Sequence, residues 1–167
     1  VQRGDVTIDG KGLDTSSADY TAILARAVQV NARLWANELS VITGANQINA
    51  VDGGNVVVSG PIAGQSPAPL FALDVSQLGG MYAGKILLVG TELGVGVRNA
   101  GDIGASAGQV KISANGMLSS SGRITSSSDI VVDTQEGINN GGSIQAQGNT
   151  NLSTRGNIDN TSLVAAL

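Results

Sequence analysis

The chain contains neither cysteine nor histidine, and aromatic residues make up only 2% of its 167 residues. Without cysteine and histidine, nucleophilic sites of the Cys/His or Ser/His/Asp kind are excluded, and so are metal sites with nitrogen or sulfur ligands. With so few aromatic residues, the core that the 41% apolar residues can form must be aliphatic. The lack of cysteine also suits a protein that stays unfolded while it crosses a cell envelope.

Charge is scarce as well, at 13% of residues, with a formal net charge of −4 and no run of lysine or arginine. A phosphate backbone or an anionic membrane would find no basic patch, so nucleic acid is not an expected partner. No stretch reaches the ~18 apolar residues of a membrane span, and no basic start leads into an apolar signal segment. The opening VQRGDVTIDG is typical of a protein's interior, so we expect a segment of a longer chain.

What the sequence has instead is glycine, 24 residues of it, and an internal repeat. The last sixty residues divide into three aligned twenties, GQVKISANGMLSSSGRITSS, SDIVVDTQEGINNGGSIQAQ and GNTNLSTRGNIDNTSLVAAL. In each unit one apolar residue is followed by another six positions later, and an alternating pair comes about six beyond that. A helix would place apolar residues three and four apart, whereas short strands separated by Gly, Asn and Ser corners fit the pattern.

A period of about 20 residues corresponds to one turn of a solenoid, in which each coil stacks its strands on those of the previous coil. The leucine-rich repeat is the rival solenoid at this period, but leucine is too sparse here for it. The sequence therefore predicts an all-β fold, a parallel β-helix.

The same template extends towards the N-terminus, with coils beginning near residues 28, 75, 97, 118, 138 and 158. Residues 19–30 are open to two interpretations, strand or helix, because Ile23, Ala27 and Val30 also keep near-helical spacing. Residues 49–74 carry all three prolines and fit no coil, so we expect an excursion with a hairpin around residues 56–58. Residues 5–14 resemble another hairpin, closed by a Gly-rich turn.

The aliphatic residues of these coils should point inward and form ladders between coils. The predicted ladder residues are Val28, Leu34, Leu39, Val41, Val75, Met81, Ile86, Leu88, Val97, Ile103, Val110, Ile112, Leu118, Ile124, Ile130, Val132, Ile138, Ile144, Leu152, Ile158 and Val164. Trp35 and Tyr82 occupy equivalent positions and should point outward and stack on the outer face or under the excursion, with a sugar platform as the alternative. Asn31, Asn99 and Asn140 lie near corners, where we expect them to cap turns or stack between coils.

Few residues are suited to chemistry. A β-helix enzyme acting on polysaccharides needs clustered carboxylates, whereas Asp129, Asp133, Glu136 and Asp159 fall on different faces in the predicted register. We therefore expect no enzyme activity and no cofactor in this chain.

One short motif is a weak binding candidate. Arg3, Gly4 and Asp5 form an RGD triplet, which in an exposed loop can bind integrins. Here the triplet leads straight into the strand-like DVTI, and a turn before a hairpin is the structural alternative. Because three-residue matches arise by chance, we favour the turn.

Two stretches carry a resemblance to a known family. GLDTSSADYTAILARAVQVNARLWANELSVITGANQI (12–48) and FALDVSQLGGMYAGKILLVGTELGVGVRNAGDIGA (71–105) resemble the later part of the two-partner secretion domain of filamentous haemagglutinins and contact-dependent growth inhibition exoproteins. LGGMYAGKI and GVGVRNAGDI are the more specific strings, and residues 108–167 resemble the first haemagglutinin repeats after such a domain. The resemblance divides the chain into residues 1–107, the later secretion domain, and 108–167, about three repeats.

The resemblance implies a right-handed parallel β-helix that is secreted to the bacterial cell surface by a dedicated outer-membrane transporter. It further implies a monomeric filament segment that displays an adhesive or growth-inhibiting activity to a receptor on a host or neighbouring cell. A carbohydrate-binding or carbohydrate-active β-helix is the alternative function.

Overall fold

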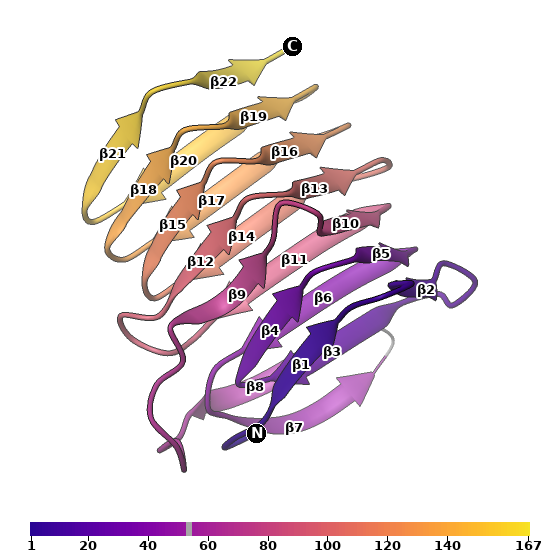
Figure 1. Cartoon of the computed structure of the whole chain (residues 1–167), viewed down its shortest axis with the longest axis vertical. Coiled ribbons are helices and arrows are strands. Elements are labelled where there is room, and N and C mark those ends of the chain that lie inside the picture. Colours follow the sequence, from indigo (N-terminus) through magenta and orange to yellow (C-terminus); the bar gives the residue numbers. More distant parts are fainter. Residues whose placement is uncertain (53–54) are drawn as a thin grey trace.

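The computed structural model describes residues 1–52 and 55–167, and side chains are described outside residues 50–55 and 57. The described chain forms strands and no helix, and the strands stack as a parallel β-solenoid of about seven turns, which confirms the predicted fold class. The coils succeed one another from the N-terminal end of the stack to the C-terminal end (Figure 1). No helix among the described residues is long and apolar enough to cross a membrane.

Each full coil contributes one strand to each of three parallel sheets. The first sheet contains β1 (Asp5–Ile8), β4 (Ala27–Val30), β9 (Phe71–Val75), β12 (Gly96–Asn99), β15 (Met117–Ser120), β18 (Gly137–Asn140) and β21 (Asn157–Asn160). The second contains β2 (Leu13–Thr15), β5 (Arg33–Ala36), β10 (Gly80–Ala83), β13 (Asp102–Ala105), β16 (Arg123–Ser126), β19 (Ser143–Ala146) and β22 (Leu163–Ala166). The third contains β3 (Thr21–Ala25), β6 (Glu38–Thr43), β11 (Lys85–Gly90), β14 (Val110–Ala114), β17 (Ile130–Thr134) and β20 (Thr150–Thr154).

The predicted hairpin at residues 5–14 is wrong. β1 pairs in parallel with β4 and β2 pairs in parallel with β5, so these two strands begin a further coil of the solenoid. The glycine-rich turn between them is a corner, in which Gly10 and Gly12 have positive φ values of 61° and 85°. It directs the chain into the next sheet instead of back along β1. Residues 19–30, which were open to two interpretations, form the strands β3 and β4.

The excursion is a hairpin of β7 (Asn46–Asp52) and β8 (Asn55–Pro61), which pair antiparallel. It lies at the N-terminal end of the stack (Figure 1), where the Val1 amino group donates to the Asn46 carbonyl at 2.6 Å. The predicted limits of 49–74 need correction at both ends. The hairpin starts at Asn46, and residues 71–74 belong to β9, a strand of the solenoid.

Aliphatic side chains fill the interior in columns that follow the strand register. In the second sheet, one column consists of Leu34, Met81, Ile103, Ile124 and Ile144, which pair in succession and are at most 1% exposed. Because every coil adds one rung to such columns, burial comes from stacking between coils.

Val75 is the one ladder residue whose register differs from the prediction. The sequence alignment placed it opposite Val28, but Val28 pairs with Leu73, and Val75 pairs with Val30 and Asn99. The reason is a longer corner, since residues 76–79 separate β9 from β10 while only residues 31–32 separate β4 from β5. Val75 is nevertheless fully buried.

Candidate functional site

Most of the predicted ladder residues line the interior. All of them up to Ile144 are buried, whereas Leu152 and Val164 are partly exposed and Ile158 is exposed. Side chains held this way in an aliphatic core offer no group for chemistry, so the features that distinguish this chain must lie at the corners and on the outer faces of the sheets.

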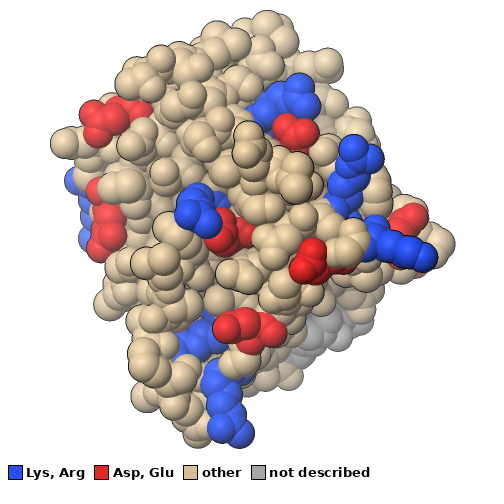
Figure 2. Space-filling model, viewed as in Figure 1, with Lys and Arg blue, Asp and Glu red and all other residues tan. Residues whose placement is uncertain are grey.

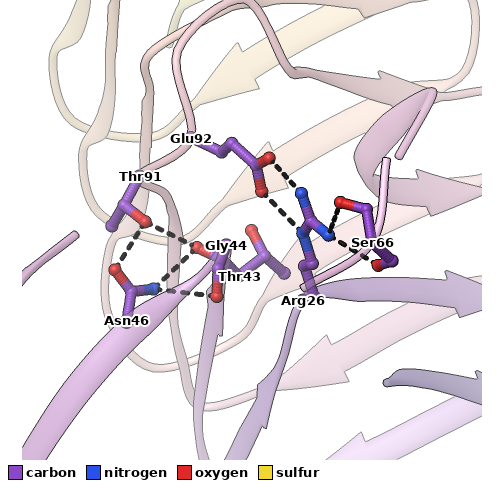
Figure 3. A network of polar contacts seen from close by, with 7 residues as sticks. All are labelled: Arg26, Thr43, Gly44, Asn46, Ser66, Thr91 and Glu92. Atoms are coloured by element: carbon purple, nitrogen blue, oxygen red, sulfur yellow. Dashed lines mark hydrogen bonds and ion pairs between the residues drawn. The ribbon is translucent and has the colours of Figure 1, made fainter. Parts of the chain in front are cut away.

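A buried arginine joins three distant parts of the chain. Arg26, in the corner between β3 and β4, has a side chain only 5% exposed. Its Nε and Nη2 atoms donate to Oε2 and Oε1 of Glu92 at 3.1 and 2.6 Å, and its Nη1 donates to the hydroxyl of Ser66 at 2.6 Å and to the Ser66 carbonyl. Figure 3 shows the guanidinium between these two residues. The pKa of Arg26 is raised, chiefly by the hydrogen bonds to Glu92.

A second group of polar contacts lies beside this ion pair (Figure 3). Asn46 is buried, its amide donates to the carbonyls of Thr43 and Gly44 at 3.1 and 3.2 Å, and its Oδ1 accepts from the hydroxyl of Thr91 at 2.7 Å. Gly44 has a φ of 108°, which favours glycine. We call Arg26, Asn46, Ser66, Thr91 and Glu92 the latch, because they fasten the excursion to the corners of coils that precede and follow it.

The outer face of the second sheet carries an aromatic pair. Trp35 and Tyr82 stack with ring centroids 6.2 Å apart and an interplanar angle of 27°, as the sequence predicted. The phenol of Tyr82 donates to Oδ2 of Asp102 at 3.1 Å, and Asp102 also pairs with Arg123. Burial, and next the hydrogen bond to Asp102, raises the pKa of Tyr82 above its usual value.

Amides and a hydroxyl form a polar column in the first sheet, which is buried except at Asn160 in the last coil. Asn99, Ser120, Asn140 and Asn160 pair in succession, and Asn140 donates to Asn160 Oδ1 at 2.8 Å and to the Leu163 carbonyl at 3.2 Å. Asn31 lies outside this column, because Val30 takes the equivalent position in its coil. The amides of Asn99 and Asn140 thus join their own coils to the next ones.

The carboxylates of the repeats do not converge. Asp129 precedes β17, Asp133 lies within it, Glu136 lies in the following corner, and Asp159 lies in β21. Figure 2 shows acidic and basic residues scattered in small mixed groups over a largely uncharged face. Among the described residues no group of acidic side chains is placed to hold a metal ion.

The RGD triplet is exposed at the start of the first coil. Asp5 is the first residue of β1, and the Gly4 carbonyl accepts the backbone N–H of Arg26 at 2.9 Å. The triplet therefore leads directly into a strand of the solenoid, with Gly4 at a positive φ of 99°. Its use as a binding motif stays a prediction.

Comparison with known proteins identifies the family. The model of the TPS secretion domain matches residues 1–120, and that of the haemagglutinin repeat matches residues 105–162. The chain is 50% identical over 150 residues to Toxin CdiA of Yersinia pestis, and 50% identical over 122 residues to tRNA nuclease CdiA-2 of Burkholderia pseudomallei. These alignments cover 90% and 73% of this chain.

A third relative, tRNA nuclease CdiA of Yersinia mollaretii, is 35% identical over 167 residues, or 99% of this chain. The chain spans only 4 or 5% of the length of these three relatives. No solved structure matches it. Exoproteins with this domain are secreted and displayed on the bacterial cell surface. By the family match over most of its length, the chain belongs to the TPS secretion domain family and continues into haemagglutinin repeats.

Proposed function

We propose that this chain is the export and display segment of a two-partner exoprotein of contact-dependent growth inhibition. The observation that supports the proposal most is the TPS secretion domain match, together with 50% identity to Toxin CdiA of Yersinia pestis over 90% of the chain. Its partner is then an outer-membrane transporter, and the display target is a receptor on a neighbouring or host cell. The segment acts as a monomer.

The solenoid suggests how export is driven. Each strand of a coil pairs only with the coil before and the coil after it, so a coil can fold as soon as it emerges beside a folded one. Each folded coil buries one more rung of aliphatic side chains, and this burial opposes movement back through the transporter. We infer that folding outside the membrane draws the chain outward.

The two parts of the chain have different roles in this proposal. Residues 1–107 engage the transporter, and residues 108–167 lengthen the filament. The nuclease activity named in two relatives is that of whole proteins of which this chain spans 4 and 5%, and in this proposal it belongs to another part of the exoprotein.

The test is an export assay on the full-length exoprotein that contains this segment. The protein is expressed with its cognate transporter, with the transporter deleted, and with residues 108–167 deleted while the transporter is present. We expect the full-length protein to reach the medium only when the transporter is present. We expect the protein that lacks residues 108–167 to be exported as well when the transporter is present. Equal export without the transporter would overturn the proposal, and lost export on deleting 108–167 would overturn the division of roles.

A further inference from the structure

A groove runs along the corner between the second and third sheets, next to the aromatic pair. It has a volume of about 580 Å³ and is lined by residues from five successive coils. The lining residues are Ser16, Trp35, Ala36, Asn37, Tyr82, Ala83, Gly84, Gly104, Ala105, Ser106, Ala107 and Thr125. With neighbouring coils about 4.8 Å apart, five coils give a groove roughly 19 Å long, which is the dimension of a short extended chain molecule.

The wall of the groove is a fixed aromatic surface. Tyr82 stacks on Trp35 on one side, and its hydroxyl is held by Asp102. The next residue in the same column is Gly104, which pairs with Tyr82 on one side and with Thr125 on the other. A Cβ atom at Gly104 would lie 3.7 Å from Tyr82 Cδ1 and 3.2 Å from Thr125 Oγ1. Because Gly104 has no side chain, nothing from this position covers Tyr82, and the next side chain in the column is the short one of Thr125.

The floor of the groove leaves little for a peptide to pair with. The Gly84 N–H donates to the Asn37 carbonyl at 2.7 Å, the Ser106 N–H to the Ala83 carbonyl at 2.9 Å, and the Ala107 N–H to the Gly84 carbonyl at 3.0 Å. These main-chain groups already join one coil to the next. An extended peptide that binds by adding a strand needs free main-chain groups, so this floor disfavours such a peptide.

The polar groups of the groove are neutral. Its lining contains hydroxyls from Ser16, Ser106 and Thr125 and an amide from Asn37, and none of the lining residues carries a charge. A phosphate, a carboxylate or a cationic group would find no counter-charge there. An aromatic wall with a few neutral hydrogen-bonding groups suits a ligand that has both an apolar ring face and hydroxyls.

We propose that this groove binds a neutral oligosaccharide. The C–H face of one sugar ring stacks on Tyr82 over Gly104, and the hydroxyls of that ring and its neighbours hydrogen-bond to Thr125, Ser106 and Asn37. No carboxylate lines the groove, so the sugar is bound and not cleaved. This site goes beyond export, since it gives the exported segment a ligand of its own.

The single tryptophan of the chain, Trp35, lies in the groove wall and reports binding directly. Trp35 fluorescence of the 167-residue chain is titrated with neutral tetrasaccharides of glucose, galactose, mannose and N-acetylglucosamine, and with a uronic acid tetramer. We expect a saturable change with at least one neutral tetrasaccharide and none with the anionic tetramer. Neutral polysaccharide from bacterial surfaces and neutral glycans from animal cells are then compared, to distinguish the two sources of such a ligand.

Two variants test the location of the site. Tyr82→Ala removes the stacking surface, and Ala107→Gln fills the groove from an exposed position without changing the core or the rings. Both should reduce affinity at least tenfold, as measured by calorimetry, while circular dichroism confirms the fold. Phe71→Ala, on the first sheet and outside the groove, is the matched aromatic control and should bind as well as the parent chain.

Absence of binding by every neutral saccharide would overturn the proposal, and so would equal binding by the parent chain and Ala107→Gln. Export of Ala107→Gln in the assay described above should be normal. Failure of the sugar site and failure of the export function are thus distinguished.

Discussion

The two parts of the solenoid are held together in different ways. In residues 108–167 the coils repeat every 20 residues, aliphatic and amide columns run from coil to coil, and the corners are short. In residues 1–107 the coils differ in length, a hairpin is inserted, and all four aromatic residues and both partners of the buried Arg26–Glu92 pair occur there. Figure 1 shows the even stack of the repeats above the less regular N-terminal coils.

The difference between the two parts shows where specific side-chain contacts are needed. Identical coils stack because equivalent residues meet, and they need nothing besides their columns. Where a corner lengthens or a hairpin interrupts the series, the chain needs specific side-chain contacts to hold the interruption in place. The latch and the aromatic pair supply these contacts only in the irregular part.

The largest loss of stability should come from substitutions in the aliphatic columns. The loss should be similar in residues 1–107 and in residues 108–167. Leu34→Ala and Ile124→Ala each remove a fully buried side chain from the same interior column. We expect each to lower the free energy of unfolding by about 2–5 kcal/mol, as measured by urea denaturation.

Amide hydrogen exchange shows which strands each substitution destabilises. Because coils contact only their neighbours, Ile124→Ala should speed exchange mainly in β13, β16 and β19, and Leu34→Ala mainly in β2, β5 and β10. Gln145→Ala, on the outer face of β19, is the control and should change stability by less than about 0.5 kcal/mol. Equal exchange throughout the chain in both variants would show that the two parts unfold as one unit.

A smaller effect, confined to the irregular part, should follow from opening the latch. Arg26→Met leaves Glu92 without its partner, and we expect the thermal midpoint to fall by several degrees and residues 62–70 to become sensitive to proteinase K. Arg26→Met with Glu92→Gln should recover part of the loss, because no unpaired charge remains.

The matched control is Arg123→Met, which breaks an ion pair whose arginine side chain is 59% exposed. Such an exposed pair contributes little to stability, so the thermal midpoint of Arg123→Met should be close to that of the parent chain. If Arg26→Met and Arg123→Met behaved alike, the latch would have no special role in holding the excursion.

The smallest effect should be on the pH dependence of stability, through the phenol of Tyr82. Its folded-state pKa is raised above the usual 10.0, by burial first and the Asp102 hydrogen bond second. The neutral phenol is thus favoured in the folded chain. This stabilisation is complete below the ordinary pKa and is lost as pH rises through the folded pKa.

We therefore expect unfolding by urea at a series of pH values to show a steeper loss of stability above pH about 10 in the parent chain than in Tyr82→Phe. Near pH 7 the two should differ by about 1 kcal/mol, the contribution of one hydrogen bond. Tyr20 is retained in both chains and serves as the internal reference. Parallel pH profiles would contradict the assigned contact with Asp102.

The sequence determined the elements that depend on local spacing. The 20-residue period, the aliphatic columns of the repeats and the outward stacking of Trp35 on Tyr82 follow from the alternation of strands and from residues that recur at equivalent positions. The same logic failed at Val75 and at residues 5–14, because corner length and strand partner are not fixed by local pattern. A glycine-rich turn has the same composition whether it reverses the chain or directs it into the next sheet.

Only the tertiary structure decided the contacts that join distant residues. Arg26 lies 66 positions from Glu92 and 40 from Ser66, so no repeat spacing pairs these residues. The groove likewise forms only where residues of five coils, Trp35 and Tyr82 among them, come together. Where coils have equal lengths, equivalent residues stack into columns, and the sequence period predicts them. Where coils have unequal lengths, the contacts between them depend on the length of each corner and on which strands pair, and only the folded chain defines these.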